Sequence, residues 1–233
     1  METLDMSAVS EPSAVSVPDC PDGSQDGMLD AKMPAHPFQF AIKRGIDIVA
    51  SIILIVVLSP ILILAAIAVK LSSAGPVFYM ANRVGLGDSR FWMYKFRSMR
   101  AAKPGEMEMQ ATGVLLKSAS HPRITPVGRI LRKTSIDELP QLFNILYGQM
   151  SLVGPRPLIP ALLGGLTESQ QLLRARVRPG ITGLFQLRDR IHGETALTMI
   201  SHDLEYIETF SLWLDLKILV LTIPAVIAGR GAI

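Results

Sequence analysis

The sequence predicts an α+β protein that is mainly helical, with a re-entrant membrane helix-break-helix, a compact cytosolic domain with a short sheet, and amphipathic interfacial helices. Three observations support this prediction. Residues 48–69 carry no charged side chain, residues 70–99 contain two segments of strand-like alternation around a glycine-containing turn, and most later segments place apolar residues at helical spacing. An apolar fraction of 49% and a mean hydropathy of +0.35 indicate membrane association.

Composition divides the chain into three parts. Residues 1–37 are rich in Ser, Pro, Gly and Asp, which predicts a disordered acidic tail. Residues 1–36 contain seven acids and one Lys, a net charge of −6, so the remainder holds 22 bases and 13 acids, a net charge of +9. We divide this basic remainder into an anchor (38–71) and a cytosolic domain (72–233). Its positive charge suits anionic lipid and phosphorylated substrates. No nucleic-acid partner is expected.

The uncharged run of 22 residues from Ile48 to Val69 is long enough to cross a hydrocarbon core of about 30 Å. A spanning helix is therefore one interpretation. Ser59 and Pro60 lie in the middle of the run, however, and proline removes a helix hydrogen bond and bends the axis. Basic residues also flank both ends, namely Lys43 and Arg44 before it and Lys70 and Arg83 after it. Because Lys and Arg favour the cytoplasmic side, we favour a re-entrant element kinked at Ser59-Pro60.

Residues 134–148 contain two adjacent acids, Asp137 and Glu138, in the predicted first turn of a short helix that ends at Gly148. A structural interpretation is available, because Ser135 and Glu138 fit a capping box and acids in a first turn complement the helix dipole. A chemical interpretation is also available. A helix N-terminus attracts phosphate, and neighbouring helical residues point about 100° apart, so the two acids suit two roles: a nucleophile toward phosphorus and a metal ligand.

Basic residues that suit phosphate lie on both sides of this pair. Lys95 and Arg97 are two residues apart in the predicted strand 91–99 and would share one face as an anion cradle, although charges on a solvated edge strand would give the same pattern. Arg156 stands in a turn stiffened by Pro155 and Pro157.

The remaining segments give further expectations. Residues 101–120 read as a surface connection, and the predicted helices are 126–133, 160–177, the segment around 202–208, and 211–228. The tight sequence 178–183 predicts a loop. The last helix is expected to pack on the domain or to lie at the membrane interface, with Trp213 at the boundary. Cys20 is the only cysteine and the four histidines lack ligand spacing, so no disulfide within the chain and no Cys or His metal site is expected.

The run from Asp137 to Pro157 resembles the signature of the bacterial sugar transferase family, the small monotopic phosphoglycosyl transferases. The resemblance extends over roughly residues 40 to 232 and includes the Lys-Phe-Arg-Ser-Met run at 95–99, the Arg-Pro-Gly-Ile-Thr-Gly run at 178–183 and a membrane element broken at Ser-Pro. It also implies roles in substrate binding for Arg190, Asp203 and Tyr206. The chain departs from the family pattern at His121, where the family usually has Asp, and at Arg188-Asp189, where it usually has Asn-Gly.

This resemblance implies a transferase at the bacterial inner membrane, with its catalytic domain on the cytoplasmic face. Such an enzyme would pass a sugar-1-phosphate from a UDP-sugar to undecaprenyl phosphate and release UMP, as the first step of exopolysaccharide or other surface glycan synthesis. Asp137 would be the nucleophile that carries the phosphosugar and Glu138 the Mg²⁺ ligand. Phosphate contacts would come from Lys95, Arg97, Arg156 and Arg190.

Two alternatives stay open at this point. A membrane-bound phosphohydrolase could use the same Asp137 with water as the acceptor, and a non-catalytic lipid-binding scaffold would need none of this chemistry. The sugar, the glycan pathway, the role of the tail and the presence of a homo-oligomer are not determined by these residues.

Overall fold

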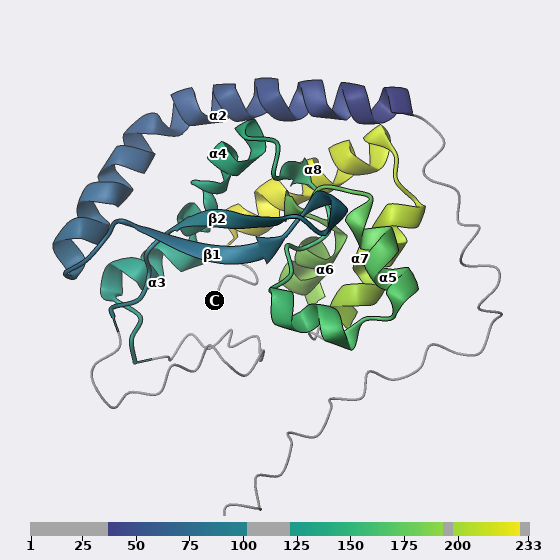
Figure 1. Ribbon diagram of the computed structural model, residues 1–233. Helices are drawn as coiled ribbons and strands as arrows, with labels where there is room; N and C mark the ends of the chain where they lie inside the picture. Colours follow the sequence, from purple (N-terminus) through teal and green to yellow (C-terminus); the bar gives the residue numbers. More distant parts are fainter. Residues whose placement is uncertain (1–36, 102–121, 193–197, 229–233) are drawn as a thin grey trace, which may run out of the picture.

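The computed structural model describes residues 37–101, 122–192 and 198–228. It confirms a mainly helical chain with short strands (Figure 1). The tail up to residue 36, the connection from 102 to 120, and His121 lie outside the described residues, so the expectations for them stay predictions. The helices are α2 (Pro37–Ser72), α3 (Pro126–Lys133), α4 (Gln141–Leu146), α5 (Glu168–Ala175), α6 (Leu184–His192), α7 (Met199–Glu208) and α8 (Leu212–Ile227).

The predicted membrane element forms one helix, α2, that bends but does not break (Figure 1). Pro60 lies inside it and has no N–H to give to the carbonyl of Val56. The Ser59 hydroxyl donates to that carbonyl instead, at 2.8 Å. The Ser-Pro pair therefore permits a bend while the freed backbone oxygen keeps a hydrogen bond.

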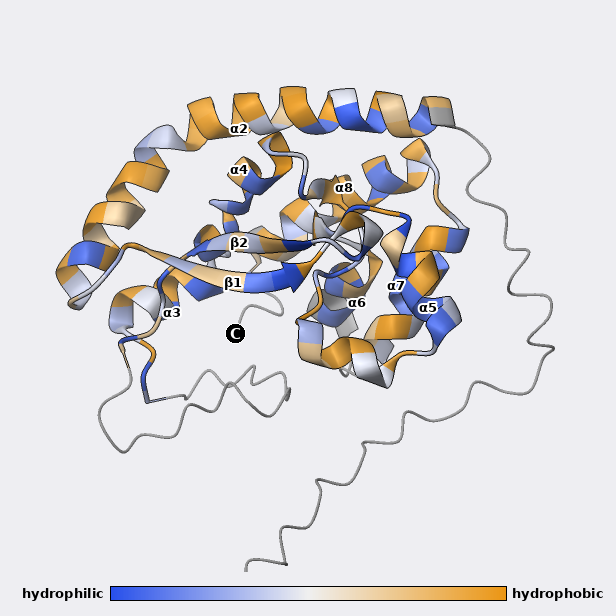
Figure 2. Ribbon diagram, in the orientation of Figure 1, coloured by the Kyte–Doolittle hydropathy of each residue, from blue (hydrophilic) through white to orange (hydrophobic). Residues whose placement is uncertain are grey.

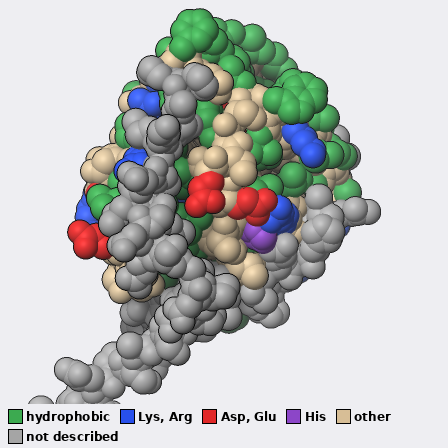
Figure 3. Space-filling model, turned by 90° about the vertical axis from the view of Figure 1, so that its right-hand side faces the viewer, with side chains coloured by type: hydrophobic (Ala, Val, Ile, Leu, Met, Phe, Trp, Pro, Cys, Tyr) green, Lys and Arg blue, Asp and Glu red, His purple; other side chains and the backbone are tan. Residues whose placement is uncertain are grey.

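The outer face of α2 is apolar and exposed. Among the described residues, α2 is the one helix long and apolar enough to cross a membrane, judged by length and composition. Its outer side is hydrophobic along most of its length (Figure 2), with Val56, Val57 and Leu64 65–66% exposed. Figure 3 shows hydrophobic side chains gathered at the end of the molecule that carries α2, and charged side chains farther from it.

The inner side of α2 packs on the rest of the chain along both of its halves. Phe40, Ala50 and Ile55 contact the main core, and Ala65 and Val69 form a second cluster with residues of β2 and α3. Both halves of α2 therefore contact the same body.

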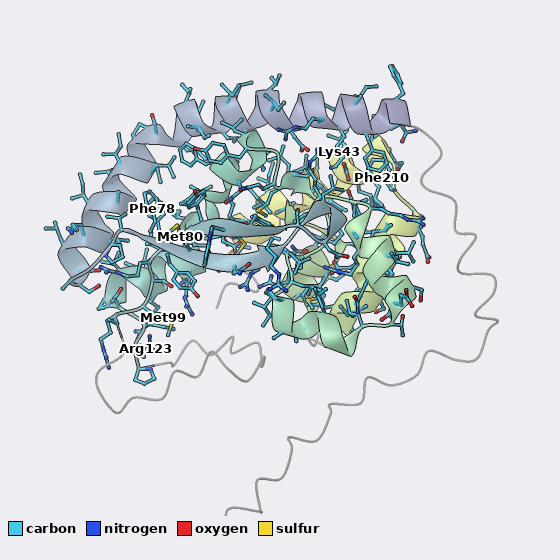
Figure 4. All side chains as sticks on the ribbon, viewed as in Figure 1. Lys43, Phe78, Met80, Met99, Arg123 and Phe210 are labelled. Atoms are coloured by element: carbon cyan, nitrogen blue, oxygen red, sulfur yellow. The ribbon has the colours of Figure 1, made fainter. Side chains whose placement is uncertain are left out.

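Lys43 and Arg44, the basic residues before the apolar run, bind protein groups. The sequence had indicated that these charges would flank the helix at the membrane surface. Lys43 Nζ donates to the Val153 carbonyl at 2.9 Å and forms an ion pair of 2.5 Å with Asp215, and Figure 4 shows it beside Phe210 beneath α2. Arg44 donates to the Ile145 carbonyl at 2.7 Å. These cations fasten α2 to α8 and to the end of α4.

The predicted hairpin is confirmed. Strands β1 (Phe78–Val84) and β2 (Arg90–Phe96) pair antiparallel and are joined through a 3₁₀ turn, Leu86–Asp88. Tyr79 pairs with Lys95 and Arg83 with Phe91. Strand β2 ends at Phe96, so it stops short of the predicted end at Met99.

Two predictions after residue 150 are wrong. The expected loop 178–183 contains strand β4 (Gly180–Thr182), which pairs parallel to β3 (Ser151–Val153). The strands fit because glycine allows close approach: a Cβ on Gly180 would lie 2.1 Å from the nitrogen of Gly154. The expected helix 160–177 is instead a 3₁₀ segment, Pro160–Gly165, followed by α5, whose start is fixed by a capping box of Thr167 and Gln170.

Candidate active site

A cavity of about 600 Å³ opens between the hairpin, α3, the start of α4 and the segment after β3. Its basic lining residues outnumber its acidic ones, since Glu138 is the one carboxylate among the described residues that line it. The basic lining residues are Arg83, Lys95, Arg123, Arg132 and Arg156. Figure 4 shows Arg123 near Met99, and both line this space together with Met80 of the hairpin. The positive lining suits an anionic ligand.

The two acids lie in a 3₁₀ turn, Ile136–Glu138, before α4 rather than in the first turn of α4. Pro140 has no N–H to give to the Ile136 carbonyl, which accepts from the Leu139 N–H at 3.2 Å. The predicted capping box is also wrong: Ser135 has a φ of 56°, and its side chain makes no capping hydrogen bond. The left-handed residue turns the chain sharply from α3 into the acidic turn.

Glu138 and Lys95 form an ion pair of 2.8 Å at the cavity wall. The pair joins the 3₁₀ turn to β2, and both side chains are about a quarter exposed or less, at 24% and 21%. The structure thus brings Lys95 to the acidic pair, as the sequence predicted for one of its two strand cations.

Asp137 is not among the described residues that line the cavity, but it belongs to the same charge cluster as Glu138 and Lys95. Burial, followed by the neighbouring Glu138 carboxylate, raises the pKa of Asp137 to about 6, while Lys95 and Arg132 act in the opposite direction. Both acids lie beside Lys95, and Asp137 is also influenced by Arg132, an arrangement in which one acid can act as a nucleophile and the other can hold a cation.

We expect the Asp137 carboxyl of the metal-free protein to titrate near pH 6, well above an ordinary aspartate. In Glu138→Gln the like charge is gone, so the pKa of Asp137 should fall, although burial keeps it above 3.8. Carbon-13 NMR of labelled aspartate carboxyl groups measures both values, with Asp137→Asn identifying the resonance. A pKa near 3.8 in both proteins would contradict the described burial.

Asn144, which the sequence analysis did not single out, holds the acidic turn beside β2. It is fully buried, accepts from the Tyr94 N–H at 2.9 Å and donates to the Trp92 carbonyl at 2.7 Å. Its side chain thus pairs with the free edge of β2 as a neighbouring strand would. The signal was available, since Asn has low helix propensity and stands here among apolar residues of a short helix.

The backbone of Arg156 is clamped from both sides. The Asp203 carboxylate accepts from the Arg156 N–H at 3.2 Å, and Arg174 donates to the Arg156 carbonyl at 2.6 Å. Arg174 and Asp203 are themselves an ion pair, with side chains 10% and 1% exposed. The predicted site residue Arg156 thus reaches the cavity from a fixed backbone, and Asp203 lies behind it.

Three other predicted site residues are not brought to the cavity. Arg97 follows the end of β2 and donates to the carbonyls of Ser73 and Ala74, because the strand alternation stops at Phe96. Tyr206 is buried and donates to Asp215 at 2.7 Å, and Asp203 makes the contacts described above. The side chain of Arg190 lies outside the described residues.

The basic residues of α3 are divided between cavity and solvent. Arg132 lines the cavity and donates to the Ser98 hydroxyl at 2.9 Å. Arg129 and Lys133 are exposed.

Arg188 and Asp189, which depart from the family pattern, lie in α6. Arg188 makes a bidentate ion pair with Glu205 of α7, at 2.6 and 2.7 Å, and Asp189 is buried. Arg188 thus ties α6 to α7.

A long apolar helix packed on a body whose cavity is lined by five basic residues and Glu138, with Asp137 next to Glu138 in the chain, defines a membrane-associated protein with a site for anionic substrates. The family model of bacterial sugar transferases matches residues 38–229, a range that includes α2 and the whole cavity. The chain belongs to the bacterial sugar transferase family.

Relatives with assigned names agree with this membership. A UDP-glucose:undecaprenyl-phosphate glucose-1-phosphate transferase of Caulobacter vibrioides is 44% identical over 196 residues, which are 82% of this chain and 71% of the relative. The exopolysaccharide production protein ExoY of Rhizobium meliloti is 39% identical over 202 residues, 82% of this chain and 87% of the relative.

A UDP-N-acetylgalactosamine-undecaprenyl-phosphate N-acetylgalactosaminephosphotransferase of Aeromonas hydrophila is 39% identical over 218 residues, 91% of this chain. The chain spans about half of that relative, 49%, and 38% of an undecaprenyl-phosphate glucose phosphotransferase of Komagataeibacter xylinus. The relatives thus differ both in length and in the sugar that their names give.

Proposed function

We propose that this protein transfers a sugar-1-phosphate from a UDP-sugar to undecaprenyl phosphate, releases UMP, and thereby initiates synthesis of an exopolysaccharide or another surface glycan. The names of the relatives support the two substrates. The observation that carries the proposal is the position of Asp137 and Glu138 beside Lys95 and Arg132, of which Glu138, Lys95 and Arg132 line the cavity.

In the first half of the proposed reaction, a carboxylate oxygen of Asp137 attacks the phosphorus that bears the sugar. The bond from this phosphorus to the oxygen that bridges the two phosphates breaks, and UMP leaves with that oxygen and its electron pair. A phosphosugar is then bound covalently to Asp137. Lys95 and Arg132, which already face this carboxylate, stabilise the charge that develops on the phosphoryl oxygens.

In the second half, a phosphate oxygen of undecaprenyl phosphate attacks the same phosphorus. The bond to Asp137 breaks and the carboxylate is regenerated, so the enzyme ends as it began. A raised pKa makes Asp137 a more basic nucleophile than an ordinary aspartate while leaving it mostly ionised at pH 7.

We propose Mg²⁺ as the cofactor. The described residues contain no group of three or more His, Cys, Asp or Glu side chains that could hold a metal by themselves. Magnesium is commonly held by one or two carboxylates together with substrate phosphates, and Glu138 is a carboxylate of the cavity lining. When bound, the ion would neutralise charge on the diphosphate.

We further propose that residues 38–71 form a re-entrant anchor in the bacterial inner membrane and that residues 72–233 form a catalytic domain on its cytoplasmic face. The contacts of both halves of α2 with the same body support this topology. A very apolar carrier and a very polar nucleotide sugar would then meet at one carboxylate near headgroup height.

Incubation of the purified protein with Mg²⁺, undecaprenyl phosphate and a panel of UDP-sugars tests the function, with UMP and the lipid product both measured. Transfer predicts equal amounts of UMP and lipid-linked product with at least one sugar. UMP with free sugar phosphate, independent of lipid, would indicate a phosphohydrolase. No turnover with any sugar would leave the scaffold interpretation.

The single cysteine offers a test of topology. In sealed inverted inner-membrane vesicles, whose cytoplasmic face points outward, we expect a membrane-impermeant maleimide to label Cys20 without detergent, because a re-entrant helix keeps both ends on one side. The variant Cys20→Ser/Ser89→Cys reports on the exposed hairpin turn as the matched control. Labelling of this control variant, with protection of Cys20 in the wild type until detergent is added, would indicate a spanning helix instead.

A further inference from the structure

Arg83, the next-to-last residue of β1, lies with Arg156 at one part of the cavity. The two residues come from segments far apart in the sequence. A hydrogen bond of 3.0 Å from the Val84 N–H to the Leu158 carbonyl joins these segments, and both guanidinium groups line the same space.

The two guanidinium groups repel each other. Burial, followed by the charge of Arg156, lowers the pKa of Arg83. Within the part of the chain that the structure describes, neither side chain is in ion-pair contact with a carboxylate, and Arg83 donates to the neighbouring Asn82 carbonyl at 3.3 Å. Partly buried like charges without a counterion are unfavourable unless an anion occupies the space between them.

This pair is separate from the charges that surround Asp137. Lys95 pairs across the hairpin with Tyr79, and Arg83 lies four residues farther along β1. At about 3.3 Å per residue, the two backbone positions are roughly 13 Å apart. A substrate with two phosphates could therefore place one beside Asp137 and the other between Arg83 and Arg156.

We propose that Arg83 and Arg156 form a second phosphate-binding subsite, which holds a phosphate group that is not attacked by Asp137. Arg83 is thus a substrate-binding residue, and the clamp on the Arg156 backbone by Asp203 and Arg174 keeps its partner in place. The identity of the ligand rests on the proposed function, in which the phosphate belongs either to the uridine nucleotide or to the polyprenyl carrier.

Binding of UMP and of inorganic pyrophosphate, measured by calorimetry in detergent, tests the subsite without turnover. A lost charge-assisted hydrogen bond predicts that Arg83→Gln weakens binding of pyrophosphate about 10-fold or more. Arg83→Lys should recover part of the affinity. Arg90→Gln removes an exposed arginine of the same hairpin outside the cavity and should bind as the wild type does.

Kinetics distinguish the two sources of phosphate. A raised KM for the UDP-sugar with weaker UMP binding assigns the subsite to the nucleotide, and a raised KM for undecaprenyl phosphate with unchanged UMP binding assigns it to the lipid. If Arg83→Gln changes no binding constant and neither KM, the subsite does not exist. Arg83-dependent binding of pyrophosphate without any sugar transfer would keep the subsite and reject the proposed function.

Stability separates a binding role from a structural one. Because Arg83→Gln removes a repulsion from Arg156, its melting temperature in detergent should equal or exceed that of the wild type. A clear fall in the melting temperature together with lost binding would show that Arg83 supports the fold, and would overturn the assignment.

Discussion

Replacement of Asp137 by Asn should lower the rate of UMP release at least about 10³-fold, because an amide of the same size cannot act as the carboxylate nucleophile. The variant should fold normally. Its neutral side chain removes a buried charge whose pKa is raised to about 6, so the free energy of unfolding at pH 7 should stay equal or increase. Steady-state UMP release and thermal unfolding measure the two effects.

Asp88→Asn is the matched control for this substitution. Asp88 is exposed in the hairpin turn and has a φ of 55°, which asparagine tolerates well, so both activity and stability should be retained.

A second measurement follows the covalent intermediate. When the wild-type protein is incubated with radiolabelled UDP-sugar and no lipid, the label should be on the peptide that contains residue 137. UMP release by Asp137→Asn at the wild-type rate would exclude this residue as the nucleophile.

Replacement of Asp215 by Leu should lower the free energy of unfolding by about 3–5 kcal/mol, because Lys43 would be left as a buried charge without its partner. The two side chains are only 11% and 9% exposed, and Tyr206 would lose its acceptor as well. Such a loss is large beside a typical total of about 5–15 kcal/mol. Denaturant unfolding in detergent micelles measures it.

The double variant Lys43→Met/Asp215→Leu removes both charges and should recover most of this loss. Glu205→Gln breaks the more exposed pair with Arg188, whose side chains are 43% and 33% exposed, and should cost about 1 kcal/mol or less. A double variant no more stable than Asp215→Leu would show that the Lys43–Asp215 pair is not what fastens α2 to α8.

Elements with a local cause were predictable from the sequence. The hairpin of β1 and β2 follows from alternation around glycine, and α3 from its spacing after Thr125, whose side chain accepts from the Gly128 N–H. The acidic pair and Lys95 were also identified correctly as neighbours, through the family resemblance. Their mutual distance, however, depends on Asn144 and on the pairing of β2.

Elements with a distant partner were not predictable. Gly180–Thr182 looks like a turn until β3 lies next to it, because a strand of three residues has no periodicity of its own. Likewise, Lys95 and Arg97 would share one strand face only if β2 continued to residue 97, but β2 ends at Phe96. From the sequence, Asp203 and Tyr206 could be polar helix residues or substrate contacts. In the structure Asp203 accepts from the Arg156 N–H and Tyr206 donates to Asp215, both inside the protein.

The sequence alone determined what is written in consecutive residues: an apolar helix with a Ser-Pro pair, a basic body, and two adjacent acids in a recognisable family signature. Only the tertiary structure decided which charges meet, so that Lys43 and Arg44 bind the protein rather than solvent and Arg83 joins Arg156 in the cavity. The physical reason is that hydrophobic periodicity determines which face of a helix or strand is buried. The interaction partner of a charged side chain depends instead on which distant segments the fold places next to it.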